Sequence, residues 1–583
     1  MATIRLNKNV DIKEDVKYIL NTLKNKLSDE YYVYYKPFLN GEMPDIVVLK
    51  KGGGLYIINL SYVNIEEISN VNFDEKVINL KDGKRMKLPM DKVNEQKCNM
   101  YSYHISSLLR AKINNIASFS LVSTGVLFTK ATQSKIQKFF KPTKYILIFG
   151  MDKLDDLIKN IKDRFEYCGK YFTNEIFEEA RQKLEGKFLK FEDEEDERFT
   201  LSSRQTELAK SKSGRFKIKG FAGSGKTLIL ANRVINHIKR MREEGKLRPK
   251  VLILTFNITL RKYISKHISR LIDEESLNNI EINHYHKFIF NKANQYNIPK
   301  FDFRNEKAFS NINIREEEKY DGIFIDEIQD YEIEWQNIIA NNFLVSNGEY
   351  VVFGDEKQNI YCRKLESDNT VKTNIKGRWN TILENHRAMG KLVYIALQFQ
   401  EKFLRSKYSI DSFDTVQEDF FGLNQLIEYI PCQNMCNISF KISEILSNPN
   451  ININKSIILS DEIEMLRDVE YKLRDDKLRH ILTFETSEEN EKIKQSNINV
   501  EERLYEVRRS KKYNFDDGKG LKFSTIHSFK GWQEDNVILV ITDNERGNNS
   551  ELIYTALTRC RKNLIILDTS SQKTYEKFFE NCI

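Results

Sequence analysis

The sequence predicts an α/β protein in which two tandem parallel-sheet domains follow a smaller α/β domain. Short, continuous apolar runs, each followed by a polar segment, are typical of strands that are buried on both faces of a parallel sheet. Such runs occur in two groups, at 216–219, 251–256, 322–325 and 350–353, and then at 456–459, 537–541 and 564–567. The long stretch between the groups indicates two separate sheets.

The composition is that of an ordinary globular protein and leaves the function open. The 583 residues are 40% hydrophobic and 30% charged, and the net charge of +8 permits a nucleic-acid partner without requiring one. The cysteines are scattered without paired CxxC spacing, which argues against a disulfide framework or a zinc ribbon and for a reducing compartment. No apolar run approaches the ~20 residues of a membrane span, and the first residues lack the pattern of a secretory signal. We therefore expect a cytoplasmic protein with no membrane partner.

A block of acidic residues marks the end of the N-terminal domain. Residues 191–198 read Phe-Glu-Asp-Glu-Glu-Asp-Glu-Arg, and a like-charge run of this kind is usually solvated. We place a linker at 191–199, after an N-terminal domain of residues 1–190. Within that domain, the patterns predict helices at 13–27 and 174–190, strands at 45–49, 55–60, 120–123 and 145–149, and a hairpin turn at 52–54.

The strongest motif is a phosphate-binding loop. Residues 220–227, Gly-Phe-Ala-Gly-Ser-Gly-Lys-Thr, match the pattern GxxxxGK[ST] between a predicted strand and a predicted helix. Glycines let backbone amides wrap the phosphates, the lysine reaches the β- and γ-phosphates, and the threonine ligates Mg²⁺. The predicted nucleotide ligands are Gly220, Ala222, Gly223, Ser224, Gly225, Lys226 and Thr227.

Two further strand ends carry polar residues that suit this pocket. The run 322–325 is followed by Asp326 and Glu327, so both acids fall at the C-terminal edge of a parallel sheet, where ligands bind in open α/β folds. Asp326 can hold Mg²⁺, and Glu327 can polarise a water molecule. After the next strand, Gln358 can sense the γ-phosphate and Tyr361 can stack on a base.

In their order, these motifs resemble the UvrD/Rep branch of superfamily 1 helicases over residues 200–570. The resemblance implies ATP as the nucleotide and two RecA-like motor domains, at 200–387 and 388–583, with only small insertions. It implies that Gln205 reads the adenine, that Gly531 contacts the nucleotide, and that Arg387 and Arg559 are arginine fingers. It also implies nucleic-acid contacts for Phe256, Asn257, His286, Tyr361, Thr525 and His527. ATP would then close the cleft between the domains, and hydrolysis would reopen it.

The sequence departs from the family pattern at two positions. Arg363 stands where a tryptophan usually follows the Gln-x-x-Tyr element, which weakens the predicted base-stacking ladder. Gln533 stands where a glutamate is usual, which leaves the nucleotide-sugar contact of that position unsupported. The polar stretch 488–520 is expected to form a surface insertion or a flexible arm. Because little chain remains for a large accessory domain, ATP-driven translocation is better supported than processive unwinding.

Near the N-terminus, Asp45 begins one apolar strand, and Asn59 and Ser61 end the next. This arrangement resembles the NERD domain, a nuclease-related fold of the PD-(D/E)xK type, whose active members carry Glu-x-Lys on the second strand to bind Mg²⁺. Asn and Ser do not supply those charges. The literal Glu-Gln-Lys at 95–97 lies in a helical pattern, where such residues do not share a face. We therefore expect a module that binds DNA or a companion protein without cutting.

The resemblance predicts an ATP-dependent translocase or helicase that moves 3′→5′ on single-stranded or tailed DNA. Some bacterial proteins of this architecture act in defence against phage, and DNA repair is the other role that we consider. Three alternatives stay open. They are a nucleic-acid-sensing ATPase that gates a partner without unwinding, a nuclease–helicase with an active N-terminal domain, and an RNA-directed motor, since backbone tracking and stacking serve either nucleic acid.

Overall fold

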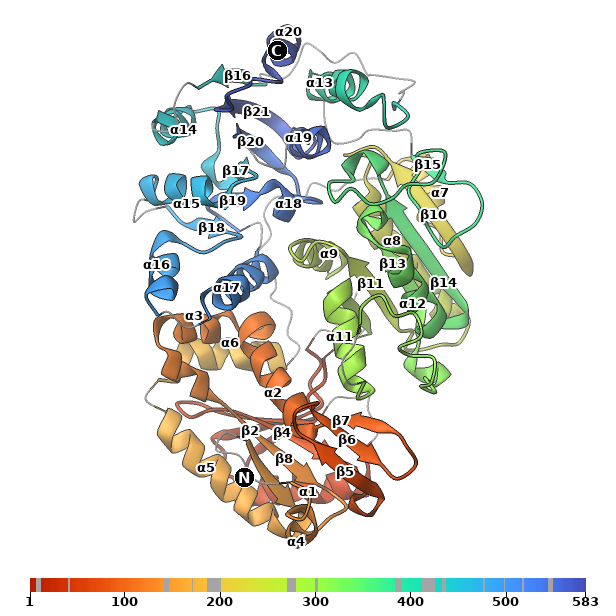
Figure 1. Cartoon of the computed structure of the whole chain (residues 1–583), viewed down its shortest axis with the longest axis vertical. Helices are drawn as coiled ribbons and strands as arrows, with labels where there is room; N and C mark the ends of the chain where they lie inside the picture. The colour runs from red at the N-terminus through yellow and green to blue at the C-terminus, as the bar shows by residue number, and fades with distance from the viewer. Residues whose placement is uncertain are drawn as a thin grey trace. The chain divides into compact units, whose positions relative to one another are not determined.

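The computed structural model divides the chain into two compact units, whose helices and strands are labelled in Figure 1. The first unit consists of Met1–Glu192 and His286–Ala308, and the second of Asp193–Tyr285 and Phe309–Ile583. The structure describes the chain except residues 7–11, 40–41, 141–145, 170, 186–200, 270–278, 299–301, 383–390, 412–424, 433–436, 475–477, 497–498, 516–517 and 544–548. The predicted linker at 191–199 and the predicted arginine finger Arg387 therefore lie outside the described residues.

The main sheet of the first unit is mixed and contains the predicted hairpin. Its order is β1-β2-β3-β4-β8-β9, from strands Thr3–Leu6, Tyr31–Tyr35, Ile46–Lys50, Gly54–Ser61, Val122–Phe128 and Ile146–Gly150. Strands β3 and β4 pair antiparallel, and the turn between them holds Gly52 at φ +60°, where glycine meets no steric penalty. Strand β8 begins later than predicted, because residues Ile116–Leu121 form a 3₁₀ helix.

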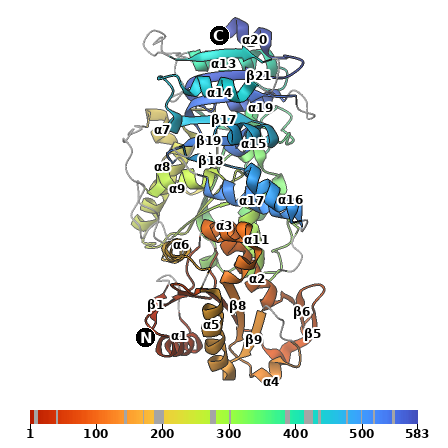
Figure 2. The ribbon, with the colours of Figure 1, turned by 90° about the vertical axis from the view of Figure 1, so that its left-hand side faces the viewer.

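Alternate residues of β3 and β4 enter two hydrophobic cores, one on each face of this sheet. Val47 and Ile57 pack in the core that includes α2, α3 and α6, whereas Ile46 and Ile58 pack in the core that includes α1 and α5. Figure 2 shows α5 lying along β8 and β9. The helices of this unit are α1 (Glu14–Lys26), α2 (Pro89–Asn99), α3 (Ser106–Asn114), α4 (Gln133–Ile136), α5 (Leu154–Cys168) and α6 (Asn174–Leu184).

The first unit also holds a small antiparallel sheet and a segment from much later in the chain. The small sheet consists of β5 (Ile68–Asn72), β6 (Val77–Leu80) and β7 (Arg85–Lys87). Helix α11 (Tyr285–Gln295) belongs to the first unit from His286 onward. A segment between the P-loop and the predicted acids thus completes the N-terminal unit.

The second unit contains two parallel sheets, which confirms the predicted fold class with two RecA-like domains. The first sheet has the order β12-β11-β13-β14-β10-β15, from Ile280–His284, Val251–Thr255, Tyr320–Ile325, Leu344–Gly354, Gly214–Gly220 and Asn380–Ile382. The second has the order β16-β21-β20-β17-β19-β18, from Ile427–Pro431, Cys560–Asp568, Glu534–Ile541, Ser456–Ser460, Leu521–Thr525 and His480–Leu482. Every predicted apolar run lies in one of these strands, with its end at most one residue outside.

Helices lie in most of the connections between the parallel strands, as parallel pairing requires. The helices of the first RecA-like domain are α7 (Ser203–Leu208), α8 (Lys226–Glu243), α9 (Leu260–Ser269) and α12 (Ile333–Asn342). In the second they are α13 (Lys391–Phe399), α14 (Ile438–Leu446), α15 (Ile463–Lys472), α16 (Ser487–Gln495), α17 (Val500–Asn514), α18 (Ile526–Phe529), α19 (Ser550–Leu557) and α20 (Glu576–Cys582). Figure 1 shows α8 crossing the first of these sheets.

The expectation of a flexible arm at 488–520 is wrong, because the stretch contains α16 and α17. Thr486 and Glu489 form a capping box at the start of α16. Ile493 on α16 and Val507 and Tyr513 on α17 are buried. The high density of charged residues hid the helical spacing of these few apolar ones.

Membrane-spanning helices, disulfides and metal clusters are all absent from the described residues. None of the helices among them is long and apolar enough to span a membrane. The cysteines among them are all free thiols. Nowhere in the described part of the chain do three His, Cys, Asp or Glu side chains gather in a way that could hold a metal ion.

Candidate nucleotide and nucleic-acid site

The P-loop joins β10 to α8 and has the backbone of a phosphate cradle. Gly223 and Gly225 adopt φ angles of +88° and +83°, in the left-handed region that favours glycine. A Cβ on Gly225 would lie 2.7 Å from Nε2 of Gln205, and one on Gly220 would lie 2.5 Å from Oγ of Ser224. That Oγ is buried and has no hydrogen-bond partner among the described residues, which suits a loop built to receive an anion.

Lys226 and Gln205 hold this loop from two sides. Nζ of Lys226 donates to the carbonyl oxygen of Gly220 at 2.7 Å. Nε2 of Gln205 donates to the carbonyl oxygen of Ser224 at 3.0 Å, while its Oε1 accepts from the backbone N of Ser202 in a capping box that starts α7. The resemblance implies that the Gln205 amide contacts adenine. In this structure, both its oxygen and its nitrogen are already hydrogen-bonded to the protein.

The two predicted acids follow β13 directly, at the C-terminal edge of the first parallel sheet. Oγ1 of Thr227 donates to Oδ2 of Asp326 at 3.3 Å, so the two predicted Mg²⁺ ligands are neighbours. A carboxylate and a hydroxyl are oxygen ligands of the kind that Mg²⁺ takes, and the pair fits that ion. Burial, together with the adjacent Glu327 carboxylate, raises the pKa of Asp326 above its ordinary value. Glu327 adopts φ +53°, and its Oε2 accepts a hydrogen bond from Gln329.

A chain of polar contacts connects the second RecA-like domain to the P-loop lysine. Nη2 of Arg559 donates to Oε1 of Gln358 at 2.7 Å. Nε2 of Gln358 donates to Oδ2 of Asp355 at 2.7 Å, and that oxygen lies 3.8 Å from Nζ of Lys226. All four side chains are buried. The predicted phosphate lysine, phosphate sensor and arginine finger therefore lie within one connected set.

Lys530 makes a second link between the two RecA-like domains. Its Nζ donates to Oδ1 and Oδ2 of Asp330 at 2.8 and 2.7 Å and to the carbonyl oxygen of Gln358 at 2.7 Å. The same Nζ lies 3.9 Å from Oε2 of Glu327. Neither Lys530 nor Asp330 is among the site residues predicted from the sequence. Asp330 follows the predicted acids Asp326 and Glu327, and Lys530 directly precedes Gly531. Their charge and their closeness to predicted site residues were therefore the signal available in the sequence.

Asn257 joins the loops of the two RecA-like domains, whereas Thr525 bonds within the second of them. Nδ2 of Asn257 donates to the carbonyl oxygens of His527, Ser528 and Lys530 at 3.1, 2.8 and 2.9 Å. Oγ1 of Thr525 accepts from the backbone N of Ser528 at 3.2 Å and so caps α18. The polar ends of both predicted nucleic-acid contacts are thus used inside the protein in this conformation.

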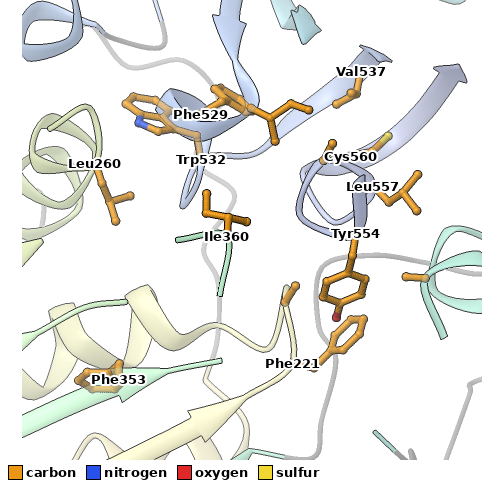
Figure 3. Close-up of a cluster of buried hydrophobic side chains, with 14 of the residues drawn as sticks. Phe221, Leu260, Phe353, Ile360, Phe529, Trp532, Val537, Tyr554, Leu557 and Cys560 are labelled. Carbon is orange, nitrogen blue, oxygen red and sulfur yellow. The ribbon is translucent and has the colours of Figure 1, made fainter. Parts of the chain in front are cut away.

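Apolar packing continues this contact between the domains (Figure 3). Gly531 adopts φ +90°, and a Cβ there would lie 2.8 Å from the side chain of Leu260. Figure 3 shows Leu260 at the start of α9. The predicted nucleotide contact at Gly531 is therefore a point of close packing on α9. Phe221 and Ala222 of the P-loop are buried, and the Phe221 ring meets Tyr554 of α19 edge-on, with centroids 6.4 Å apart.

Aromatic rings form a row across the predicted nucleic-acid residues. The ring centroid of Phe256 lies 4.7 Å from that of Tyr361, which lies 5.7 Å from that of His527. Trp335 of α12 stacks on Phe256 with centroids 6.3 Å apart and planes 12° apart. Tyr361 is 36% exposed, so its ring is accessible to a base. Trp335 is only 4% exposed and packs against Phe256 from the protein interior. Trp335 is not among the residues predicted from the sequence, because it lies outside the motifs that carry the family resemblance.

Arg363, which departs from the family pattern, covers this supporting ring. Its guanidinium carbon lies 5.3 Å from the centroid of Trp335, within range of a cation–π contact. Nη1 of Arg363 donates to Oε1 of Glu332 at 2.6 Å, and Nε donates to the carbonyl oxygen of Asp330. The arginine is therefore held in place at the end of the aromatic row.

Two groups of predicted residues lie in the first unit. His286 packs its ring against Phe303, with centroids 5.0 Å apart. Asp45 accepts hydrogen bonds at Oδ2 from Nδ2 of Asn59 at 2.8 Å and from the backbone N of Leu60 at 3.0 Å. Oγ of Ser61 is buried and has no hydrogen-bond partner among the described residues. Asn59 thus uses its amide to bind the one acid of the nuclease-like motif.

Family models match two regions of the chain. Residues 205–364 match the model described as an AAA domain, and residues 521–567 match the UvrD-like helicase C-terminal domain. The first region is thus similar to an AAA domain, and the second is similar to a UvrD-like helicase C-terminal domain. The AAA match begins at Gln205 and includes the P-loop, both acids and Gln358. The UvrD-like match includes Lys530 and Arg559, so the polar contacts between the two RecA-like domains join the two matched regions.

The sequence and fold also have a distant similarity to a viral helicase of known structure. The complex of arterivirus nonstructural protein 10 (helicase) with DNA is similar at 10% identity, with a TM-score of 0.26. The alignment covers 65% of this chain and 65% of the viral chain, which is less than two thirds of the viral chain's length. No curated protein matches the sequence.

Proposed function

We propose that this protein is an ATP-dependent motor that moves on single-stranded nucleic acid, as a helicase or translocase. The observation that carries the proposal is the hydrogen bond from Arg559 to Gln358, at 2.7 Å. It brings a guanidinium of the UvrD-like domain to the phosphate-sensing side chain of the AAA domain. A nucleotide pocket built from both domains opens and closes as the triphosphate is bound and hydrolysed.

Each side chain of this pocket has one task in the proposed cycle. Lys226 exchanges its contact with the Gly220 carbonyl for the β- and γ-phosphates. Glu327 orients the attacking water and accepts its proton, while Gln358 and Arg559 approach the γ-phosphate from the side of the cleft. Mg²⁺, when bound at Thr227 and Asp326, shares the negative charge of the phosphates.

The aromatic row supports nucleic acid as the track. Phe256 and Tyr361 belong to the AAA domain, and His527 belongs to the UvrD-like domain. Base–aromatic stacking is tolerant of sequence, which suits a motor that must pass over every base. Because the row extends over both domains, a change in the cleft alters the spacing of the stacking rings.

We further propose single-stranded or tailed DNA as the substrate and 3′→5′ as the direction, with a role in repair or in defence against phage. These finer points rest on the resemblance of the motifs. For the N-terminal unit we propose binding of DNA or of a companion protein without cleavage. Two observations support this proposal. Asp45 already accepts a hydrogen bond from Asn59, and the neighbouring strand β4 carries no Glu-x-Lys sequence.

The test is the ATPase rate of the full chain with single-stranded DNA, duplex DNA, RNA or no nucleic acid. We expect single-stranded DNA to raise the rate and Lys226→Ala to abolish it. Lys239→Ala, an exposed lysine on the same helix, is the matched control and should leave the rate unchanged. Strand displacement on duplexes with a 3′ or a 5′ tail then gives the direction. Stimulation without displacement favours the sensing ATPase, and a rate that no nucleic acid changes contradicts the motor.

A further inference from the structure

Helix α11 contacts the N-terminal domain through several polar side chains. From His286 onward the helix belongs to the first unit, although its sequence lies between the P-loop and the predicted acids. The contacts come from two places in the N-terminal domain. One is a buried charge cluster around Glu42, and the other is Lys87 at the end of β7.

The charge cluster pairs Glu42 with Lys287 of α11. Nζ of Lys287 lies 3.4 Å from Oε2 of Glu42, and it also lies 4.3 Å from the ring centroid of Tyr103. Nε2 of His104 contacts the same oxygen at 2.8 Å, and Nδ2 of Asn99 donates to Oε1 at 2.9 Å. Burial alone would raise the pKa of Glu42, but Lys287, His104 and Asn99 together lower it to about 2. The carboxylate is therefore charged at neutral pH, inside the protein.

Lys87 holds the other end of the helix. Its backbone N donates to the carbonyl oxygen of Asn297 at 3.1 Å, and its Nζ donates to Oδ1 of Asn294 at 2.7 Å. The same Nζ forms an ion pair with Glu95 on α2. Two lysines, one on each side, thus tie α11 to the N-terminal domain by polar contacts.

This face also contains polar atoms that remain unpaired. Oδ1 and Nδ2 of Asn291, which lies one helical turn after Lys287, are buried without a hydrogen-bond partner among the described residues. The same holds for Oε2 of Glu95 and Oε1 of Gln96, both on α2. Unpaired buried polar atoms are rare in permanent cores, because each one loses its bonds to water. Helix α11 also buries the apolar side chains Phe288, Ile289 and Ala293, so the polar contacts lie beside ordinary apolar packing.

We propose that this face is a reversible latch, by which the N-terminal domain holds α11 and thereby restrains nucleic-acid binding. The charged pair Glu42–Lys287 keeps the latch closed, and the unpaired amides keep it weak enough to open. In the closed state, Lys287 holds the start of α11 on the N-terminal domain, and the neighbouring residue is His286, a predicted nucleic-acid contact. Opening releases the part of the helix that carries this ring. The regulatory half of the proposal rests on the proposed function, whereas the latch itself does not.

Two variants with opposite expected effects on latch opening test the proposal in the full chain. Glu42→Gln combined with Lys287→Met removes both charges, so that neither is left buried alone, and it should open the latch. Asn291→Leu replaces unpaired amide atoms with a side chain of similar size, and it should close the latch further. Glu66→Gln combined with Lys135→Met is the matched control, since that pair is exposed in the same unit.

The first measurement is hydrogen exchange of peptides that cover 286–298. We expect exchange about tenfold faster in the double variant and slower than wild type in Asn291→Leu, with no change in the control. Unchanged exchange in both test variants would overturn the latch. This measurement needs neither nucleotide nor nucleic acid.

The second measurement is affinity for a single-stranded DNA oligonucleotide by fluorescence anisotropy. We expect tighter binding by the double variant and weaker binding by Asn291→Leu. Faster exchange with unchanged or weaker DNA binding in the double variant overturns the regulatory role. If wild type binds no nucleic acid at all, the proposed function fails and the regulatory role fails with it, while the exchange data still decide the latch.

Discussion

Arg559 and Gln358 lie in different RecA-like domains and share a hydrogen bond of 2.7 Å from Nη2 to Oε1. Gln358 in turn contacts Asp355, whose carboxylate lies 3.8 Å from the P-loop lysine. The proposed phosphate sensor, Gln358, and the proposed arginine finger, Arg559, are therefore in contact in this conformation. Their contact makes Arg559 the first residue to test.

We expect Arg559→Ala to lower the kcat of ATP hydrolysis by about 10³-fold, the range found for arginine fingers, because the transition-state charge loses its cation. Nucleotide binding should persist, since Lys226 and the loop amides remain. Turnover and the Kd of a fluorescent ATP analogue, measured side by side, separate the two effects. Arg561→Ala is the control, as its guanidinium pairs with Asp535 on the same sheet. Equal losses in both variants would contradict a special role for Arg559.

We expect Lys530→Met to lower the free energy of unfolding by about 3–5 kcal/mol, because it leaves the buried Asp330 carboxylate without its partner. The double variant Lys530→Met/Asp330→Asn should recover most of that loss. Denaturant unfolding of wild type, Lys530→Met, Asp330→Asn and the double variant gives the coupling energy between the two side chains. Additive effects would show that the pair is not an interacting unit.

We expect Phe256→Ala and Tyr361→Ala each to weaken binding of single-stranded DNA by about 1–3 kcal/mol, the usual contribution of one stacked base. The ATPase rate without nucleic acid should stay the same, since neither ring contacts the P-loop residues described above. Anisotropy titrations measure the affinity. Tyr505→Ala removes a 62% exposed ring from α17 and serves as the control, and a loss as large in that variant would argue against the aromatic row.

We expect Glu42 to make the first unit dependent on pH. Its pKa is about 2 in the folded protein and 4.5 ordinarily, so its stabilising effect is complete above pH 4.5 and is lost as the pH falls toward 2. Glu42→Gln should therefore be less stable than wild type at neutral pH by about 3 kcal/mol, and the difference should shrink in acid. Urea unfolding followed by circular dichroism over this range measures it. A difference that stays constant with pH would contradict the assigned pKa.

We expect the purified full chain to leave plasmid DNA intact in the presence of Mg²⁺, and Asp45→Ala to behave identically. The reason is that the second strand carries Asn59 and Ser61 in place of the acid and the lysine. Gel assays of supercoiled substrate detect a single nick. Nicking by wild type that disappears in Asp45→Ala would establish the nuclease–helicase alternative.

Local features of the fold followed from the sequence alone. The apolar runs located strands of both parallel sheets, and the glycine pattern located the P-loop, because backbone geometry and side-chain period are set by neighbours in the chain. Edge strands such as β15 and β18 are short and have no comparable apolar run. The helices α16 and α17 were missed because their charged residues outnumber the few that are buried.

The sequence by itself determined the two RecA-like domains, the phosphate-binding loop and the acids at the strand end. Only the tertiary structure decided that Arg559 meets Gln358, that Trp335 backs the aromatic row, and that α11 belongs to the N-terminal unit. The physical reason is range. A contiguous motif is encoded by local backbone preferences, whereas contacts between distant segments depend on which surfaces are buried together, and no local pattern records that choice.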